Sequence, residues 1–349
     1  MNEVKQSRNF KIEQIVMSVE ELVCNTEPDV FDPLTFEGYQ RKIVASHCEK
    51  IVDYILEKEF FFPSPIICST RENKKNPEKM WIVDGQHRIE AFKILKESAN
   101  PLYKRKYDEI KYYTIPVIKL INPDVNNEIS TFITINKTGK KVDTSLAQIL
   151  NNKISSPPNK DEMKRAAKID YLCVELAKRV NEKELSMWTD LISFDDNPRK
   201  EGKLISLNAF VKAERTLISK LEKRGLLCFD WDNDMTALEK TINLLEKSFT
   251  IKWNAIEKKW AALFNGNIEY RSVLQGSIGC NSINKFIGVK LIQNTNITSF
   301  DNFIDYEVQL INGLKVSYEN WIKGKYYSRY SSESGYSFIA KDLEKNYYD

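Results

Sequence analysis

The sequence has few of the residues from which metal centres and disulfide frameworks are built. Its 349 residues include only two histidines, His47 and His87, and six cysteines, none of them in Cys-x-x-Cys spacing. Structural zinc sites use clustered cysteine and histidine, and disulfide scaffolds use dense, regularly spaced cysteines. The composition therefore argues against both and is typical of a protein kept in a reducing cytoplasm.

Long apolar runs, fixed-period repeats and a marked charge imbalance are also absent. No stretch approaches the ~18–20 apolar residues needed to cross a bilayer, and residues 1–10 are polar rather than signal-like. Lys and Arg number 52 against 49 Asp and Glu, which gives a formal charge of +3. A protein that wraps nucleic acid nonspecifically carries a larger basic excess, so any DNA contact requires a local patch. We expect a cytoplasmic protein with no membrane partner.

Composition and periodicity divide the chain into a mixed part and a helical part. We expect residues 1–35 to be an N-terminal adaptor with a short helical pattern over Ile12–Val23, and residues 36–150 to form the first domain. Residues 151–160 are rich in Asn, Ser and Pro, which is typical of a linker. Helical stripes dominate residues 161–349. The predicted fold class is mixed α+β, with a small-sheet α/β domain followed by an α-helical domain.

The first domain is predicted to alternate strands and helices. Apolar residues recur every fourth position over Phe36–Leu56 and predict an amphipathic helix. His47 falls in that stripe, where a histidine is more often a buried core residue than a ligand. Strands are predicted at Phe60–Cys68, Trp81–Val83 and Thr114–Ile118.

A polar turn, Asp84-Gly85-Gln86-His87-Arg88, connects the Trp81–Val83 strand to the next helical pattern. A helix start leaves backbone N–H groups unpaired, and the helix dipole attracts an anion to them. Arg88 adds a planar fork suited to phosphate, and His87 can donate, accept or transfer a proton. The turn predicts a phosphate site. The alternative is structural, with Asp84 as a helix cap, Arg88 paired to an internal carboxylate and His87 buried in a hydrogen bond.

Three further segments are candidates for ligand contact. The turn Asn136–Lys141 places three lysines around a glycine before a helix, and is either a second anion-binding turn or a solvated basic loop. The small-residue loop Leu274–Cys280 could admit a ligand, although a tight helix–helix corner is the preferred interpretation. Near the C-terminus, basic residues interleaved with tyrosines are typical either of DNA contact or of a soluble tail. These basic residues are Lys323, Lys325 and Arg329.

Asp84–Arg88 spells the signature of the DGQHR-domain proteins, and the chain resembles this family. The family includes DndB-like proteins of DNA phosphorothioation systems and DpdB-like proteins of deazaguanine DNA-modification systems. The turn also resembles, more remotely, the phosphate-binding turn of the ParB and sulfiredoxin superfamily. Three other blocks support the resemblance, Gly38–Arg41, Phe62–Ile67 and Phe132–Lys140. It covers residues 36–150 and implies a ParB/sulfiredoxin-like fold for that domain.

The resemblance implies a site for ATP or another NTP together with Mg²⁺. The residues implied for nucleotide binding are Gly85, Gln86, Arg88, Arg41, Asn136, Lys137 and Lys140. Asp84 and His87 are implied as acid/base or water-orienting residues if hydrolysis occurs. Sulfiredoxins require a cysteine in this turn, where the present chain has Gln86, so covalent thiol chemistry is not expected.

These observations give one leading functional expectation and two alternatives. We expect a nucleotide-binding protein, with ATP hydrolysis left open, that serves a bacterial DNA-modification or phage-defence system. The first alternative is a DNA-binding transcriptional regulator of the DndB type without catalysis. The second is a ParB-like metal-dependent nuclease, for which Asp84 and Glu90 are a thin set of ligands and no metal site is identified. The implied partners are DNA and other proteins of the modification system, and a homo-oligomer is allowed.

Overall fold

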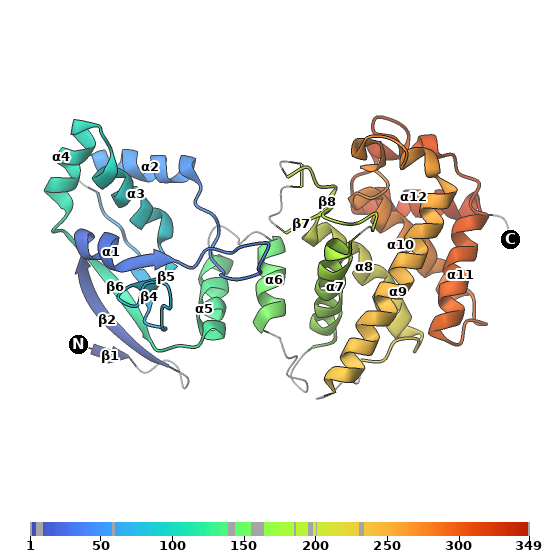
Figure 1. The fold of residues 1–349 in the computed structure, drawn as a ribbon, viewed down its shortest axis with the longest axis horizontal. Coiled ribbons are helices and arrows are strands. Elements are labelled where there is room, and N and C mark those ends of the chain that lie inside the picture. The colour runs from blue at the N-terminus through green and yellow to red at the C-terminus, as the bar shows by residue number, and fades with distance from the viewer. Residues whose placement is uncertain are drawn as a thin grey trace. The chain divides into compact units, whose positions relative to one another are not determined.

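The chain forms two compact units, Met1–Val142 and Asp143–Asp349, which are described separately (Figure 1). Together the two units have the predicted mixed α+β fold class. For residues 2–4, 137–138 and 144 only the backbone is described. The computed structural model describes residues 2–4, 10–57, 60–138, 144–154, 164–184, 186–194, 198–199, 201–229 and 234–347.

The first unit is built on a six-stranded mixed sheet. In spatial order its strands are β1 (Asn2–Val4), β2 (Lys11–Ser18), β6 (Thr114–Ile121), β4 (Ile66–Ser69), β5 (Met80–Asp84) and β3 (Thr26–Pro28). Strand β2 runs antiparallel to β1 and β6, and β4 runs parallel to β6 but antiparallel to β5. Strand β3 pairs in parallel with β5. The signature turn therefore begins where β5, an inner strand, ends.

Helices cover both faces of this sheet. One face shares a hydrophobic core with the first four helices, to which Val52, Ile66, Phe92 and Val117 belong. Neighbouring residues of a strand point to opposite faces of a sheet, so Ile67 and Ile118 lie on the other face. There they line a groove together with residues of α5. The helices are α1 (Val19–Asn25), α2 (Ala45–Leu56), α3 (Gln86–Glu97), α4 (Pro101–Ile110) and α5 (Val125–Thr138).

The helical pattern predicted over Ile12–Val23 is wrong for its first half. Residues up to Ser18 form β2, which pairs with β6 along its whole length. Ser18 then caps α1, because its side chain accepts a hydrogen bond from the Glu21 N–H while the Glu21 carboxylate accepts one from the Ser18 N–H. The hydrogen-bonded pairing of β2 with β6 thus outweighs the helical spacing of the apolar residues. The expected N-terminal adaptor contributes three strands to the sheet.

The predicted helix Phe36–Leu56 is also wrong at its start, since α2 begins only at Ala45. Before it, the Tyr39 and Gln40 N–H groups donate to the Asp29 carbonyl, so these backbone donors are used outside a helix. Gly38 has φ +74°, and a Cβ there would lie 2.2 Å from the Val30 carbonyl oxygen. The segment therefore folds back on residues 29–31 instead of starting a helix.

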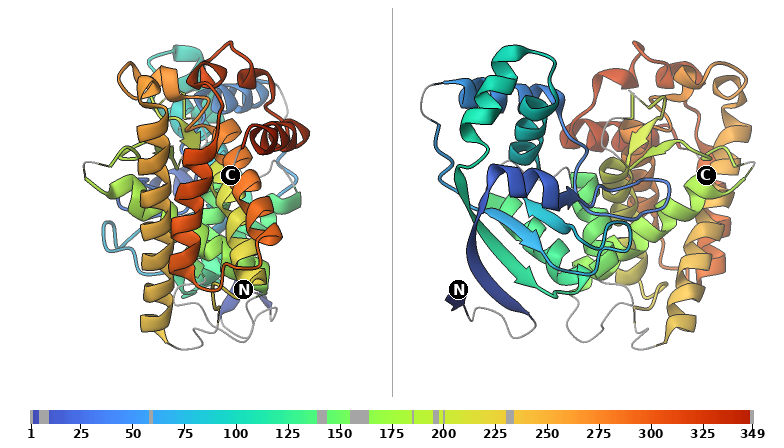
Figure 2. Two further views of the ribbon diagram at one scale, coloured as in Figure 1. Left: turned by 90° about the vertical axis from the view of Figure 1, so that its right-hand side faces the viewer. Right: turned by 60° about the vertical axis from the view of Figure 1, so that its left-hand side comes forward.

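The second unit is helical, as predicted for the C-terminal part. Helices α9 and α11 run side by side, and α8 packs on α7 and α10 (Figure 2, left). Its core contains a cluster of aromatic rings from Trp188, Phe210, Phe249 and Trp253. The helices are α6 (Thr144–Ile154), α7 (Arg165–Glu182), α8 (Leu207–Lys223), α9 (Met235–Lys259), α10 (Ser277–Gln293), α11 (Phe300–Gly313) and α12 (Glu333–Lys345). Short elements are β7 (Ile192–Ser193), β8 (Ile205–Ser206), η1 (Ala261–Leu263), η2 (Ile268–Arg271), η3 (Tyr318–Trp321) and η4 (Tyr327–Arg329).

Helix α6 packs within this second unit. It contacts α7 and α8, and Ser145 accepts a hydrogen bond from the Asn208 N–H at 3.1 Å. The division of the chain thus falls before α6, and residues 151–154 of the expected linker are helical. Residues 155–163 lie outside the described residues. Within the described ranges, no helix combines the length and apolar character needed to span a bilayer.

Candidate anion-binding site

The signature turn joins β5 to α3 through a glycine in a left-handed conformation. Gly85 has φ 100° and ψ 12°, and a Cβ at this position would lie 2.4 Å from Ile66 Cδ1. The left-handed conformation favours glycine here, and the Ile66 side chain would have to shift to admit a Cβ. Helix α3 then begins at Gln86, and no side chain caps its N-terminus. The first-turn N–H groups and the helix dipole make this corner favourable for an anion.

Arg88 holds this corner to the segment that precedes β4. Its Nη2 donates to the Pro65 carbonyl at 2.9 Å and to Asp84 Oδ2 at 3.1 Å, and its Nη1 donates to the Ser64 carbonyl and hydroxyl. The side chain is only 12% exposed. Burial lowers the pKa of Arg88, and the Asp84 carboxylate opposes that change. Its guanidinium is thus engaged with protein acceptors, and a phosphate contact from Arg88 stays a prediction.

Arg41, Gln86 and Asn136 come together although they are far apart in the sequence. Arg41 Nη2 donates to Asn136 Oδ1 at 2.9 Å, and Gln86 Nε2 donates to the Arg41 carbonyl at 3.1 Å. Gln86 is 6% exposed. Its Oε1 and the Nε of Arg41 are buried without a hydrogen-bond partner among the described residues. One acceptor and one donor of the site are therefore not used by the described residues.

His87 contacts a second histidine that the sequence assigned to the core. The Val44 N–H donates to His87 Nε2 at 3.3 Å, so this nitrogen acts as an acceptor. The His47 ring lies 4.9 Å from the His87 ring, centroid to centroid, at 72°. His47 is half-buried and lines the cavity, so the prediction of a core histidine is wrong. The buried residues of α2 are instead Cys48, Val52 and Ile55.

These side chains line one cavity of about 420 Å³. This volume is within the range of small-ligand sites. Arg41, Lys42 and Arg88 supply its positive charge, Asp84 supplies a carboxylate, and Phe62 contributes to an apolar wall. The cavity thus combines cations, an uncapped helix start and unpaired polar atoms.

The predicted turn Asn136–Lys141 begins later than expected. Helix α5 continues to Thr138, so Asn136 and Lys137 belong to its last turn. Asn136 lines the cavity, where its Nδ2 donates to the Phe132 carbonyl at 2.8 Å. The Lys137 side chain and all of Lys140 lie outside the described residues.

A buried network that the sequence analysis missed connects α5, which carries Asn136, to Tyr39, Ser69 and Arg71. Glu128, on α5, is fully buried and accepts hydrogen bonds from Tyr39 at 3.0 Å, Ser69 at 2.6 Å and Arg71 at 2.8 Å. Burial, together with the Glu128 charge, raises the pKa of Tyr39 well above its usual value. The Arg71 guanidinium also lies 4.9 Å from the centre of the Trp81 ring. A lone glutamate in a short helical pattern gave no signal of this role.

The three basic residues near the C-terminus do not share one environment. Lys323, Lys325 and Arg329 are all exposed, and of these three residues Lys323 lines a cavity of about 590 Å³ to which the other two do not contribute. Beside them, the rings of Tyr330 and Phe338 stack with centroids 4.6 Å apart, and Phe338 is 42% exposed. The predicted mixture of basic and aromatic groups is therefore present at the surface. Their contact with DNA stays a prediction.

Among all the residues that the structure describes, no three His, Cys, Asp or Glu side chains lie closely enough together to hold a metal ion.

Comparison with curated proteins gives no match, and neither does comparison with solved structures. Among protein families, the model of DndB, described as DNA-sulfur modification-associated, matches residues 10–296. The match spans the signature turn and most of the helical unit, and it confirms the expected DndB resemblance, whereas kinship to DpdB-like and ParB-like proteins stays a prediction. The chain belongs to the DndB family of DNA-sulfur modification-associated proteins.

Proposed function

We propose that this component of a DNA-sulfur modification system binds the phosphates of ATP or another NTP in the cavity beside Gly85. The observation that carries the proposal is the pair of unpartnered buried atoms, Gln86 Oε1 and Arg41 Nε, at the uncapped start of α3. Buried polar atoms without partners are uncommon in folded proteins, and each one needs an explanation, such as a bound water or ion. The α3 N–H groups would hold phosphate oxygens, with Arg41 and Lys42 neutralising their charge.

Within this proposal, Arg41 is the ligand-binding arginine and Arg88 is a positioning residue. Arg88 already donates to three protein residues, so it would fix the turn that presents the α3 N-terminus. Arg41 keeps a buried N–H that can turn to a phosphate oxygen. Mg²⁺ would arrive with the nucleotide, held mainly by phosphate oxygens and water. Asp84 is the carboxylate among the described lining residues and would orient the attacking water if hydrolysis occurs.

Calorimetric titration of the full chain with ATP and Mg²⁺ tests the binding. We expect one site, and we expect Arg41→Ala to weaken it about tenfold or more, since a charge-assisted hydrogen bond is lost. Arg105→Ala, on the exposed face of α4, is the matched control and should bind as the parent does. Absence of binding by ATP, GTP, CTP and UTP would reject the proposal. Phosphate release by the parent and by Asp84→Asn then decides whether the bound nucleotide is hydrolysed.

A second candidate function, DNA binding by a regulator of the DndB type, is favoured by one observation. The stacked rings of Tyr330 and Phe338 lie at the surface near the cations Lys325 and Arg329. Such rings can stack on bases while the cations neutralise phosphates. Binding should weaken steeply with salt, and the double variant Lys325→Ala/Arg329→Ala should reduce the slope of log K against log salt by about 2. An unchanged slope would reject this surface, whereas Arg41→Ala should leave it unaffected.

A further inference from the structure

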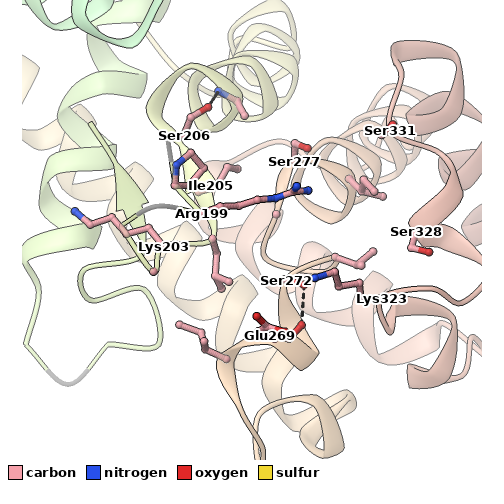
Figure 3. A pocket seen from close by; sticks show the side chains of 18 residues that line it. Arg199, Lys203, Ile205, Ser206, Glu269, Ser272, Ser277, Lys323, Ser328 and Ser331 are labelled. Carbon is pink, nitrogen blue, oxygen red and sulfur yellow. Dashed lines mark hydrogen bonds between the residues drawn. The ribbon is translucent and has the colours of Figure 1, made fainter. Parts of the chain in front are cut away.

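The helical unit contains a cavity of its own, of about 590 Å³ (Figure 3). Its lining comes from three parts of the chain, namely residues 198–199 and 202–206 before α8, residues between 268 and 278 at the start of α10, and Lys323, Ser328 and Ser331 before α12. The small-residue loop Leu274–Cys280 contributes to this wall. Its Gly276 is packed so that a Cβ would lie 2.2 Å from the Ser272 carbonyl oxygen. The loop is therefore the tight corner that the sequence predicted, and it also borders a cavity.

Two cations are directed at this cavity. In Figure 3 the Arg199 side chain extends across it toward Ser277, and the Lys323 side chain lies beside Ser272. Neither cation makes an ion pair with a carboxylate among the described residues, although Glu269 is also part of the lining. Two positive charges thus converge on one space.

A third cation of the same lining, Lys203, differs from these two because it forms ion pairs with carboxylates of the protein. It pairs with Asp190 at 3.1 Å and with Glu201 at 3.5 Å, and its side chain points away from the cavity (Figure 3). Its charge is therefore already balanced by the protein. The contrast identifies Arg199 and Lys323 as the pair available to a ligand.

Neutral hydrogen-bonding groups surround the same space. Helix α10 is 17 residues long and starts at Ser277, with no side chain capping it. Its first residues, Ser277 and Ile278, line the cavity, so the helix dipole adds positive potential there. The hydroxyls of Ser206 and Ser331 also belong to the lining, whereas those of Ser272 and Ser328 already donate to the Glu269 and Lys325 carbonyls. A guanidinium, an ammonium, hydroxyls and a helix start make this environment suited to a compact anion.

We propose that this cavity binds a small molecule carrying a terminal phosphate. A phosphate monoester carries a charge of about −1.5 to −2 at neutral pH, which the two cations Arg199 and Lys323 attract and the Glu269 carboxylate of the same lining opposes. The cavity volume suits one small ligand, with space for an organic group beside the phosphate. The DNA backbone is a poorer fit, because the neighbouring cations Lys325 and Arg329 that would follow a strand lie outside the lining. The site is independent of the one beside Gly85.

The experiment uses the full chain carrying Arg41→Ala, which weakens the other proposed site. Calorimetric titrations with inorganic phosphate, AMP and adenosine compare the anion alone, the monoester and the same body without phosphate. We expect phosphate and AMP to bind at one site and adenosine not to bind. Adding Arg199→Ala or Lys323→Ala should weaken AMP binding about tenfold or more. Both side chains are exposed, so the melting temperature should stay that of the parent.

Lys325→Ala is the matched control, because it removes the same charge from the same exposed segment outside the cavity. It should leave AMP binding unchanged. Failure of both phosphate and AMP to bind would overturn the proposal. Equal weakening by Lys325→Ala and Lys323→Ala would also overturn it, since diffuse surface charge would then explain the binding. Displacement of AMP by a DNA duplex would assign the cavity to the nucleic acid instead.

Discussion

The Arg88 guanidinium lies 3.1 Å from the Asp84 carboxylate, so the first and last residues of the signature turn are joined to each other. The same guanidinium donates to the carbonyls of Ser64 and Pro65, on a different segment of the chain. Two residues that suggest ligand chemistry in the sequence are thus also part of the structural frame of the corner. Variants at these positions report on folding as well as on binding.

Arg88→Ala should destabilise the first unit by about 2–3 kcal/mol, since it leaves Asp84 and two carbonyls without a buried donor. Urea unfolding followed by tryptophan fluorescence measures the change. Arg88→Lys should recover only part of it, because an ammonium cannot reproduce the planar fork. Full stability of the alanine variant would show that these hydrogen bonds contribute nothing net.

Gly85→Ala should destabilise by more than the ~1–2 kcal/mol of a left-handed alanine, because its Cβ also meets Ile66. Gly225→Ala provides the comparison, since Gly225 has φ +66° and open space around its added Cβ. Thermal unfolding of both variants separates the two contributions. Equal losses would mean that Ile66 moves aside freely.

Glu128→Ala should destabilise the first unit by about 3 kcal/mol, because it leaves Arg71, Ser69 and Tyr39 without their shared buried acceptor. Glu97→Ala, at the exposed end of α3, serves as the control and should change stability little. Urea unfolding of the two variants is the measurement. A small effect at Glu128 would show that the network contributes little to the stability of the first unit.

Glu307, buried in the second unit, should make stability depend on pH. Burial raises the pKa of its carboxyl from 4.5 to about 8, against the opposing effects of Lys252 and Ser248. The folded state therefore holds this proton more tightly than the unfolded state. Its stabilising effect is complete below about pH 4.5 and is lost as the pH rises through about 8.

The Glu307→Gln variant isolates this effect, because its amide is neutral at every pH. Between about pH 6 and pH 8 the parent should lose stability relative to the variant, at a limiting slope of roughly 1.4 kcal/mol per pH unit. Thermal unfolding across this range measures the difference. Parallel curves for the two proteins would show that Glu307 does not titrate in it.

The part of the fold that could be predicted is the part set by local pattern. The run Trp81–Val83 and the glycine after it predicted a strand that ends in a helix start, and β5 and α3 meet there. By contrast, Ile12–Val23 carries apolar spacing that suits a helix, yet pairing with β6 makes its first half a strand. A local pattern contains no information about which distant strand will offer the pairing.

The site shows the same division between local and distant information. Arg41, Gln86 and Asn136 were predicted to meet because of the family resemblance, and they do share one cavity. The acceptors that engage Arg88, at Ser64 and Pro65, could not be predicted, since they are main-chain atoms brought near by tertiary folding. The place of His47 could not be predicted either, because tertiary packing selects Cys48, Val52 and Ile55 as the buried residues of α2.

The hydrogen bonds of Arg88 have a mechanical consequence. They connect the start of α3 to the segment entering β4, and β4 is paired with both β5 and β6 in the interior of the sheet. Any force that a ligand exerts on the first turn of α3 is therefore transmitted to the middle of the sheet. The backbone amides of Ile66–Ser69 should exchange their hydrogens more slowly when the neighbouring cavity is filled. Residues that touch no ligand would then report its arrival.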